Sequence, residues 1–453
     1  MNIAFLVRYF PKLSETFILN QITGLIDLGH EVEVFAEAPS GDPDPPEIER
    51  YGLRRRTHYF NVPEGLAPRA GRALALLARA LRARPAEGAR RERVRRCLRA
   101  LNVLRFGRYS LKVLYAIQPF LGRRFDVLQC HYGGMGNLGA ALKEAGVEGK
   151  LAVMFHGTDI REGLERGGAI YRRLFRNADA VLAISAYNER HLLAFGAKPE
   201  TLIRHPVGID VSLFEEPKTR RDEQEVAEGP EAENSRKRTQ GTQRAGRLLR
   251  SLAAVSPSGQ DGRARECGPK VRVLTVARLT PVKGVDIGLR AMAELRQRRP
   301  ARALEYRIVG DGPQRAELEA LADRLGLRDV VRFLGALPHA EVARELAEAD
   351  LYLLPSRAEA LPVALMEAQC AGLPAVAARV GSVEEIVEDG QSGVVVPAED
   401  PAAMAGALAD LLARPETWAE LGRRGRERVT RQYDIRALNR RLTQIYEGLL
   451  AGG

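Results

Sequence analysis

The sequence predicts an α/β protein built from two doubly wound domains that face a central cleft. Three observations lead to this prediction. Short apolar runs alternate with amphipathic segments of helical spacing, a pattern typical of parallel sheets covered by helices on both faces. The pattern stops near residue 212 and restarts at residue 271. With 453 residues, the chain is also too long for one ordinary hydrophobic core.

Residues 1–212 form the predicted N-terminal domain, which is Rossmann-like. It opens with the apolar run NIAFLV, followed by a helix in which Ile18, Ile22 and Leu25 recur at helical spacing and Gly29 supplies the stop. Later apolar runs predict strands at 31–36, 125–132, 150–157, 179–186 and 201–210. Helices are predicted at 137–146, 170–178 and 187–194.

Residues 271–430 repeat this alternation and form a second Rossmann-like domain. Its predicted strands lie within 270–279, 304–313, 330–337, 350–356, 373–382 and 393–398. Residues 215–269, between the domains, are polar, charge-mixed and poor in aromatic residues, which predicts a disordered insertion. The last segment, 431–453, predicts one amphipathic helix that we expect to return to the N-terminal domain.

Basic charge gathers in one segment of the N-terminal domain. The net charge is +11, and residues 66–124 hold sixteen Lys and Arg against two acids, so the rest of the chain carries −3. Leucines share this segment at helical spacing, which predicts helices that dock on an anionic membrane surface. The alternative is that the leucines pack on the first sheet and the arginines are merely exposed. Few aromatic residues interleave, which argues against a nucleic-acid-binding surface.

The composition indicates a cytoplasmic protein, which membrane docking would hold at the inner face of the cell membrane. The opening residues MNIAFLVRYF have no basic stretch ahead of their apolar run, unlike a signal peptide. No apolar run reaches the roughly 18 residues that span a bilayer. The scattered cysteines, which we expect to be reduced packing residues, are Cys97, Cys130, Cys267 and Cys370.

The phrase VARLTPVKG supplies a candidate phosphate loop. Arg278 and Lys283 follow the first strand of the second domain, and Gly284 lets the chain turn into a helix. A diphosphate is bound by positive charge and helix N-terminal N–H groups, and this loop offers both. Further on, Gly310 and Gly312 in IVGDGP form a tight strand-to-helix turn, and the absence of GxGxxG there weakens a nicotinamide-binding interpretation.

Two acids flank an apolar stretch in PSRAEALPVALMEAQCAGLP. Glu359 lies in the loop after a predicted strand, and Glu367 lies on the helix that begins near Pro362. Carboxylates at this edge can accept hydrogen bonds from the hydroxyl groups of a sugar or ribose. The alternative is one acid favoured by the helix dipole and one exposed acid.

These motifs, in this order, resemble the second domain of the retaining glycosyltransferases of family 4, which have the GT-B fold. The resemblance covers nearly all of 1–212 and 271–450 and leaves 215–269 unmatched. It implies two acids in an E-x7-E motif. One departure is Ala360, where the family usually has glycine, and an alanine reduces the freedom of a loop that presents backbone N–H groups.

The resemblance also implies roles for the donor-site residues. Glu359 would face the donor hexose and Glu367 the ribose, with Arg278 and Lys283 on the diphosphate. The implied donor-binding residues are Arg278, Lys283, Gly310, Gly312, Glu359, Leu361, Pro362, Val363 and Glu367. The candidate catalytic residues are His156, Arg278, Lys283 and Glu359.

Three motifs of the first domain match the same family. FHGTD, with His156 and Asp159, matches a His-Gly-x-Asp phrase whose histidine lies near the hexose and the acceptor. HYGG, with His131, matches another strand end. FPKLSETFILNQI resembles the exopolysaccharide branch, the colanic-acid-type transferases, although Ser14 also suits the N-cap of the following helix. The candidate acceptor-binding residues are Lys12, Ser14, Glu15, His131 and Asp159.

The sequence therefore predicts a retaining hexosyltransferase of polysaccharide biosynthesis. Its substrates would be a UDP- or GDP-sugar donor and a saccharide or lipid-linked saccharide acceptor, with no cofactor, no metal and no nucleic-acid partner. Protein cations and a helix dipole would stabilise the leaving diphosphate. The alternative is another GT-B enzyme, such as a sugar-nucleotide epimerase, which would need no acceptor face. A phosphorylase would need a Schiff-base lysine near a glycine-rich site, and none is evident.

Overall fold

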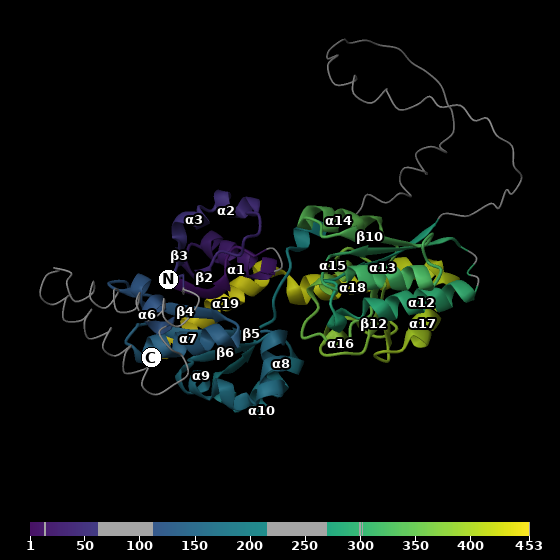
Figure 1. Ribbon diagram of the computed structural model, residues 1–453. Helices are drawn as coiled ribbons and strands as arrows, with labels where there is room; N and C mark the ends of the chain where they lie inside the picture. The colour runs from purple at the N-terminus through teal and green to yellow at the C-terminus, as the bar shows by residue number, and fades with distance from the viewer. Residues whose placement is uncertain (13–14, 62–111, 215–269, 299, 301, 453) are drawn as a thin grey trace, which may run out of the picture.

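The structure, a computed structural model, describes residues 1–12, 15–61, 112–214, 270–298, 300 and 302–452. These residues form two α/β units, each built on one parallel sheet, so the predicted fold class is confirmed (Figure 1). Residues 62–111, which include most of the basic segment 66–124, lie outside the described residues. So does the whole insertion 215–269.

The N-terminal sheet has the strand order β3-β2-β1-β4-β5-β6-β7, and all its strand pairs are parallel. Its strands are β1 Asn2–Tyr9, β2 Glu31–Ala38, β3 Thr57–Tyr59, β4 Val127–His131, β5 Lys150–Phe155, β6 Ala180–Ala183 and β7 Leu202–Arg204. Its described helices are α1 Thr16–Asp27, α2 Pro46–Arg50, α3 Leu53–Arg56, α6 Lys112–Ile117, α7 Gly133–Glu144, α8 Gly157–Arg166, α9 Arg172–Asn177 and α10 Ala186–Ala194.

The C-terminal sheet has the order β10-β9-β8-β11-β12-β13, again with parallel pairs. Its strands are β8 Val271–Val276, β9 Leu304–Val309, β10 Val331–Gly335, β11 Leu351–Leu354, β12 Ala375–Ala378 and β13 Gly393–Val396. Its helices are α12 Val285–Gln297, α13 Arg315–Arg324, α14 His339–Glu348, α15 Val363–Cys370, α16 Val383–Ile386, α17 Pro401–Ala413 and α18 Trp418–Tyr433.

Several helices differ from the sequence-based expectation. Helix α7 begins at Gly133 instead of residue 137, so its first turn includes glycines that approach neighbouring side chains closely. A Cβ on Gly136 would lie 2.4 Å from a methyl carbon of Leu174, so only glycine fits this close approach. Helices α8, α17 and α18 were not predicted from the sequence. The polar face of α18, rich in arginine and glutamate, obscures its buried stripe.

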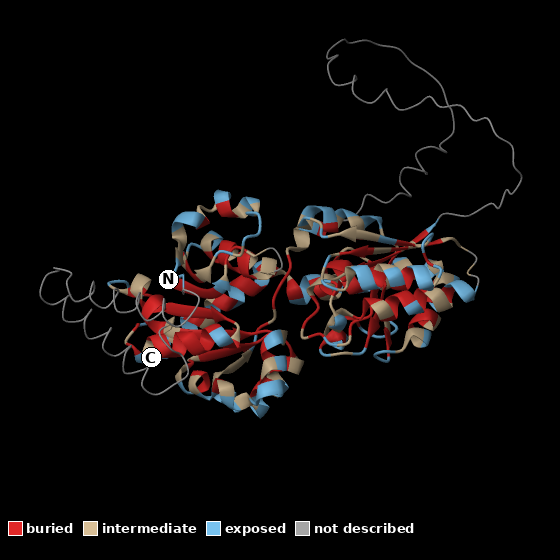
Figure 2. Ribbon diagram, in the orientation of Figure 1, coloured by how far each residue is buried: buried red, intermediate tan, exposed pale blue. Residues whose placement is uncertain are grey.

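Buried residues fill both faces of each sheet, and the outer faces of the helices are exposed (Figure 2). The short apolar strands are almost completely buried, as β4, β6 and β12 illustrate. This burial leaves only the strand ends free to carry exposed polar groups. In open parallel sheets, ligands bind outside the carboxyl ends of the strands.

The last helix, α19 Ile435–Ala451, leaves the C-terminal domain and packs on the N-terminal one. Asn439 donates a hydrogen bond to the Asn20 carbonyl at 3.2 Å, and the Tyr446 hydroxyl donates to Gln129 Oε1 at 2.8 Å. The segment that follows β7 and the segment that joins α18 to α19 lie side by side. The Ile209 N–H donates to the Tyr433 carbonyl at 2.9 Å. Helix α19 therefore ties the two domains together.

Shortening a buried leucine of α19 tests this tie. Leu442 is fully buried, so Leu442→Ala should lower the free energy of unfolding by about 2–5 kcal/mol, measured by urea denaturation. Leu450→Ala, at a position 38% exposed on the same helix, is the matched control and should change it by about 0.5 kcal/mol or less. Equal effects of the two variants would show that α19 does not pack as described.

Candidate functional site

The candidate site gathers residues that follow the carboxyl ends of strands in both sheets. In the N-terminal domain, Tyr132 follows β4 and His156 follows β5. In the C-terminal domain, Arg278 follows β8 and Glu359 lies in the loop after β11. Because all strands in each sheet are parallel, these side chains share one edge of their sheet. Contacts between the two domains, described below, bring the two edges together.

Glu359 and Lys283 form an ion pair at the centre of the C-terminal edge. Lys283 Nζ lies 2.7 Å and 2.9 Å from the two carboxylate oxygens of Glu359. The Ser356 hydroxyl donates to the same carboxylate at 2.7 Å. The Glu359 side chain is only 6% exposed, whereas that of Lys283 is 30% exposed. The buried carboxylate is therefore charge-compensated, and the ammonium faces outward.

Close backbone packing holds the loop that carries Lys283. Gly284 has φ +60, and a Cβ there would lie 2.0 Å from the Pro355 carbonyl oxygen. Arg357 braces the same turn through two 2.8 Å contacts with Asp286 and another with the Pro281 carbonyl. The loops that carry Lys283 and Glu359 thus support each other.

Gly310 and Gly312 pack under the loop that carries Arg278. A Cβ on Gly310 would lie 1.9 Å from the Ala277 carbonyl oxygen, and one on Gly312 would lie 2.4 Å from the Leu279 carbonyl oxygen. The glycines therefore allow two loops to approach each other, which is a structural reason for their presence. Arg278 itself is exposed, on the segment between these two contacts.

The second acid of the pair, Glu367, is held by a histidine of another helix. Glu367 lies on α15 and is 7% exposed, and His339 Nε2 lies 2.9 Å from its Oε1. This hydrogen bond raises the pKa of His339. Between the two acids, Leu361 precedes the helix, Pro362 is its N-cap and Val363 is its first residue. The next turn buries Leu365 completely, so the apolar stretch packs α15 on its sheet.

The two domains meet beside Glu359. A Cβ on Gly157, the first residue of α8, would lie 2.7 Å from Cβ of Ala360. Glycine at 157 therefore makes room for the alanine that departs from the family pattern. Ala360 is not among the residues of positive φ, so its methyl group causes no backbone strain. Across the same interface, the Ala186 N–H donates to Glu385 at 2.9 Å.

His156 is anchored by a buried polar chain that runs to helix α1. His131 Nδ1 lies 3.2 Å from His156 Nε2, and His131 Nε2 lies 2.9 Å from Gln21 Oε1. With Gln21 Oε1 accepting from His131 Nε2–H, the unprotonated Nδ1 of His131 accepts a hydrogen bond from the Nε2–H group of His156. Burial lowers the pKa of His156 to about 3, so both rings are neutral. His131 is completely buried, which supports a positioning role and not contact with an acceptor.

Asp159 is likewise a positioning residue in this structure. Its two carboxylate oxygens accept the backbone N–H groups of Gly133 at 2.9 Å and His156 at 2.8 Å. These bonds join the loops after β4 and β5, and burial raises the pKa of the carboxyl group to about 7. With both oxygens bonded and only 3% of the residue exposed, the geometry does not offer Asp159 to an acceptor.

The loop after β1 reaches the same edge. Lys12 Nζ contacts Glu15 at 2.5 Å, and Glu15 lies close enough to Tyr132 to raise the pKa of its hydroxyl group, which burial raises most. Arg278 of the other domain is close enough to Tyr132 to affect its pKa, which burial raises. Residues of both domains therefore lie near Tyr132. Ser14 lies outside the described residues.

Four residues of the site were not predicted from the sequence: Gln21, Tyr132, His339 and Ser356. One signal was available, because Gln21 falls on the apolar face of α1, three residues after Ile18, where a polar side chain needs a buried partner. Tyr132 has φ 72, and such strain concentrates at functional sites, but no sequence pattern reveals it. His339 and Glu367 are 28 residues apart in the sequence and come together only in the folded chain.

Two further findings concern metals and membranes. Among the described residues, no group of three or more His, Cys, Asp or Glu side chains is arranged to hold a metal ion. Within the same part of the chain, no helix combines the length and apolarity needed to cross a bilayer.

The described cysteines, Cys130 and Cys370, are buried free thiols.

The buried histidines predict a loss of stability in mild acid. Burial lowers the pKa of His156 and of His205 to about 3, and that of His131 well below its usual value. Between about pH 4 and 6, these three histidines therefore bind protons in the unfolded chain but not in the folded chain, while Asp159, with its raised pKa, binds one more proton in the folded chain. Through these four groups, the free energy of unfolding should fall by about 2.7 kcal/mol for each unit by which the pH is lowered.

Urea unfolding at several pH values and constant ionic strength measures this slope. His205→Asn, which removes one of these rings, should reduce the slope by about 1.4 kcal/mol per pH unit. A stability that stays constant between pH 6 and pH 4 would contradict the neutral, buried state of these rings.

Comparisons with known proteins place these features in a family. Residues 264–428 match the family described as glycosyl transferases group 1, and residues 14–208 match the glycosyl transferase 4-like domain. A putative colanic acid biosynthesis glycosyltransferase of Salmonella typhimurium is 33% identical over 470 residues, 99% of this chain and 100% of that protein. An amylovoran biosynthesis glycosyltransferase of Erwinia amylovora is 30% identical over 469 residues, again 99% and 100%.

Solved structures agree in fold. Anabaena HepE in complex with UDP-glucose has a TM-score of 0.65 at 18% identity, covering 99% of this chain and 100% of that one. Sucrose-phosphate synthase from Thermosynechococcus elongatus has a TM-score of 0.67 at 20% identity and full coverage of both chains. The chain therefore belongs to the family 4-like, group 1 glycosyltransferases, enzymes of the GT-B fold.

Proposed function

We propose that this enzyme transfers a hexose, with retention and without a metal, from a nucleoside diphosphate sugar to a saccharide or lipid-linked saccharide acceptor. The observation that carries the proposal is the cluster of Lys283, Glu359 and Ser356, with Arg278 on the same β8–α12 loop as Lys283. The relatives named for colanic acid and amylovoran biosynthesis support a role in exopolysaccharide assembly. The donor would be a UDP- or GDP-sugar.

Arg278 and Lys283 are proposed to bind the diphosphate. The Lys283 ammonium, which faces outward, would exchange part of its contact with Glu359 for phosphate oxygens. The negative charge that develops on the leaving diphosphate would then be stabilised by groups already in place. Release from Lys283 would leave Glu359 free to accept hydrogen bonds from the donor hexose. Lys283 would thus act on the diphosphate and Glu359 on the hexose, the two groups joined by the bond that breaks.

Glu367 is proposed to accept hydrogen bonds from the ribose, while His339 holds its second oxygen in place. Leu361 and Val363 would present backbone N–H groups to the hexose. Pro362 has no N–H, so its contribution is to set the direction of α15. His156 would lie near the hexose and the acceptor, at the domain contact beside Ala360.

The acceptor is proposed to bind on the N-terminal domain, with Lys12 and Glu15 at the cleft. The basic segment 66–124, if it docks on an anionic membrane, would hold a lipid-linked acceptor close to the site. Each Lys or Arg near such a surface contributes about 1 kcal/mol. This proposal depends on residues 62–111, which lie outside the described residues.

Single substitutions test the donor site. Lys283→Ala should lower kcat/KM for the donor, and Glu367→Ala should raise donor KM, each by roughly 10- to 150-fold, since each removes a charge-assisted bond of about 1.5–3 kcal/mol. Release of UDP or GDP from a panel of sugar nucleotides measures both. Lys270→Ala, before the amino end of β8, and Glu416→Ala, on an exposed turn, are matched controls. Full activity of both site variants would refute the assignment.

Chelation tests the proposed metal independence. Because Arg278 and Lys283 supply the positive charge, transfer should continue in EDTA at nearly the untreated rate. The assay compares initial rates in EDTA alone and in EDTA with excess magnesium or manganese. A rate that vanishes with EDTA and returns with either metal would show that protein cations do not suffice.

A further inference from the structure

Glu385 of the C-terminal domain reaches across to the first residue of helix α10 in the N-terminal domain. Its two carboxylate oxygens accept the Ala186 N–H at 2.9 Å and 3.2 Å. The first N–H groups of a helix have no partner within the helix, and a negative charge is favoured beside them. Figure 1 shows α8 and α10 on the side of the N-terminal domain that faces α16, the helix of Glu385. A directional hydrogen bond therefore joins the two domains at this place.

On the C-terminal domain, helix α16 with Glu385 begins against the loop of Glu359. Just before α16, the Ser382 hydroxyl donates to the Ala360 carbonyl. A Cβ on the preceding Gly381, which has φ +55, would lie 1.4 Å from the Glu359 carbonyl oxygen. Glu385 and Glu359 thus lie on segments that pack directly against each other.

On the N-terminal domain, the first turn of α10 is tied to the segment of His156. Asn188 is completely buried, and its side-chain amide donates to the Phe155 carbonyl at 3.0 Å. The Asn188 N–H donates in turn to the Ser185 hydroxyl at 3.2 Å. Phe155 is the last residue of β5, and His156 follows it. A shift of α10 would therefore move the backbone beside His156.

The same two edges also meet at Gly157 and Ala360. That contact is between the Ala360 methyl group and the Gly157 backbone, so it limits how closely the two loops approach but does not fix a direction. The hydrogen bond to Glu385 has a defined donor and acceptor and prefers a nearly straight N–H···O arrangement. Together, the two contacts determine how close the edges come and how they are turned relative to each other.

We propose that Glu385 is a positioning residue for the transfer reaction: its carboxylate docks the start of α10 and thereby holds His156 at a fixed place relative to Glu359. The inference rests on the proposed function, in which both His156 and Glu359 lie at the donor hexose. The groups proposed to bind the diphosphate and the ribose all belong to the C-terminal domain. Loss of the docking contact should therefore slow the chemical step and leave nucleotide binding intact.

Two variants of the full chain break the contact from opposite sides. Glu385→Ala removes the acceptor. Ala186→Pro removes the donor, and proline suits this place because Ala186 is the first residue of α10 and the preceding Ser185 is extended, with φ −157 and ψ 166. Each should lower kcat at least tenfold, measured as UDP or GDP release from the sugar nucleotide that the parent chain uses. The Kd of the free nucleotide, from titration calorimetry, should stay within about twofold.

A conservative variant and a double variant separate positioning from general damage. Glu385→Gln keeps an oxygen that can accept the Ala186 N–H, so its kcat should stay within about fivefold of the parent value. Because both single substitutions break one contact, Glu385→Ala combined with Ala186→Pro should lower kcat no further than either alone. Glu384→Ala is the matched control: Glu384 pairs with Arg379 of its own domain, and its loss should leave kcat unchanged.

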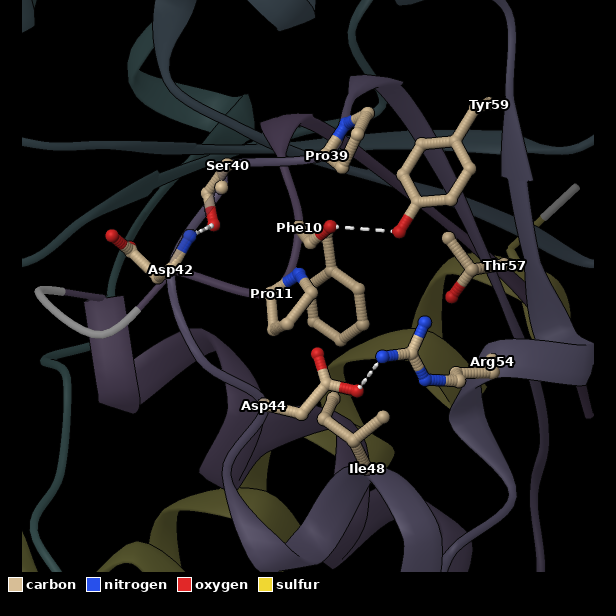
Figure 3. A pocket seen from close by; sticks show the side chains of 11 residues that line it. Phe10, Pro11, Pro39, Ser40, Asp42, Asp44, Ile48, Arg54, Thr57 and Tyr59 are labelled. Atoms are coloured by element: carbon tan, nitrogen blue, oxygen red, sulfur yellow. Dashed lines mark hydrogen bonds and ion pairs between the residues drawn. The ribbon is translucent and has the colours of Figure 1, made fainter.

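Hydrogen exchange followed by mass spectrometry reads the contact itself. In a peptide that covers 183–192, the amide of Ala186 should exchange at least tenfold faster in Glu385→Ala than in the parent chain. Asp44→Ala is the control from the N-terminal domain. Asp44 lines a pocket between β1, β2 and α3, where it pairs with Arg54 of the same domain (Figure 3). Its loss should leave the exchange of Ala186 unchanged.

Melting curves identify a variant that fails to fold, and the other single variant then decides. Three results would overturn the positioning role: an unchanged kcat in the folded variants, a Kd that rises as much as kcat falls, or effects that add in the double variant. A parent chain that releases nucleotide from no sugar nucleotide would instead refute the proposed function.

Discussion

The ion pair between Lys283 and Glu359 is the interaction on which the rest of the C-terminal edge depends. A carboxylate as buried as that of Glu359 is costly to desolvate unless a partner compensates its charge. Lys283 and Ser356 supply that compensation. To bring the ammonium there, the chain must turn at Gly284 against the Pro355 carbonyl. The tight loop geometry thus follows from one electrostatic requirement.

The N-terminal edge differs from the C-terminal edge, because the groups at its centre are neutral. His131 and His156 are buried side by side, and burial lowers the pKa of both. The two neutral rings are oriented by hydrogen bonds: one joins His131 to Gln21 and the other joins His131 to His156. The centre of the C-terminal edge therefore holds an ion pair, whereas the centre of the N-terminal edge holds two neutral rings. Helix α19 and the contact of Gly157 with Ala360 keep these two edges together.

Much of the fold was predictable because the strands are nearly continuous apolar runs bounded by glycine and proline. The two-domain division, the sheet class and the chemistry-bearing loops follow from that pattern. Local composition misled where packing overrides propensity, as at Gly136 in α7. Tyr132 and His339 could not be predicted, because their importance arises from long-range contacts with Glu15 and Glu367. Site residues that belong to a sequence motif were predicted. Residues whose role is to position another side chain were mostly not predicted.

The same division explains why His131 and Asp159 change role between sequence and structure. Both lie in phrases that resemble family motifs, and a motif shows that a residue matters without showing what it touches. The structure shows that Asp159 accepts backbone N–H groups from two different strand-end loops, and that His131 lies behind His156. Each acts through its neighbour. Both side chains therefore hold the strand-end loops and the His156 ring in place.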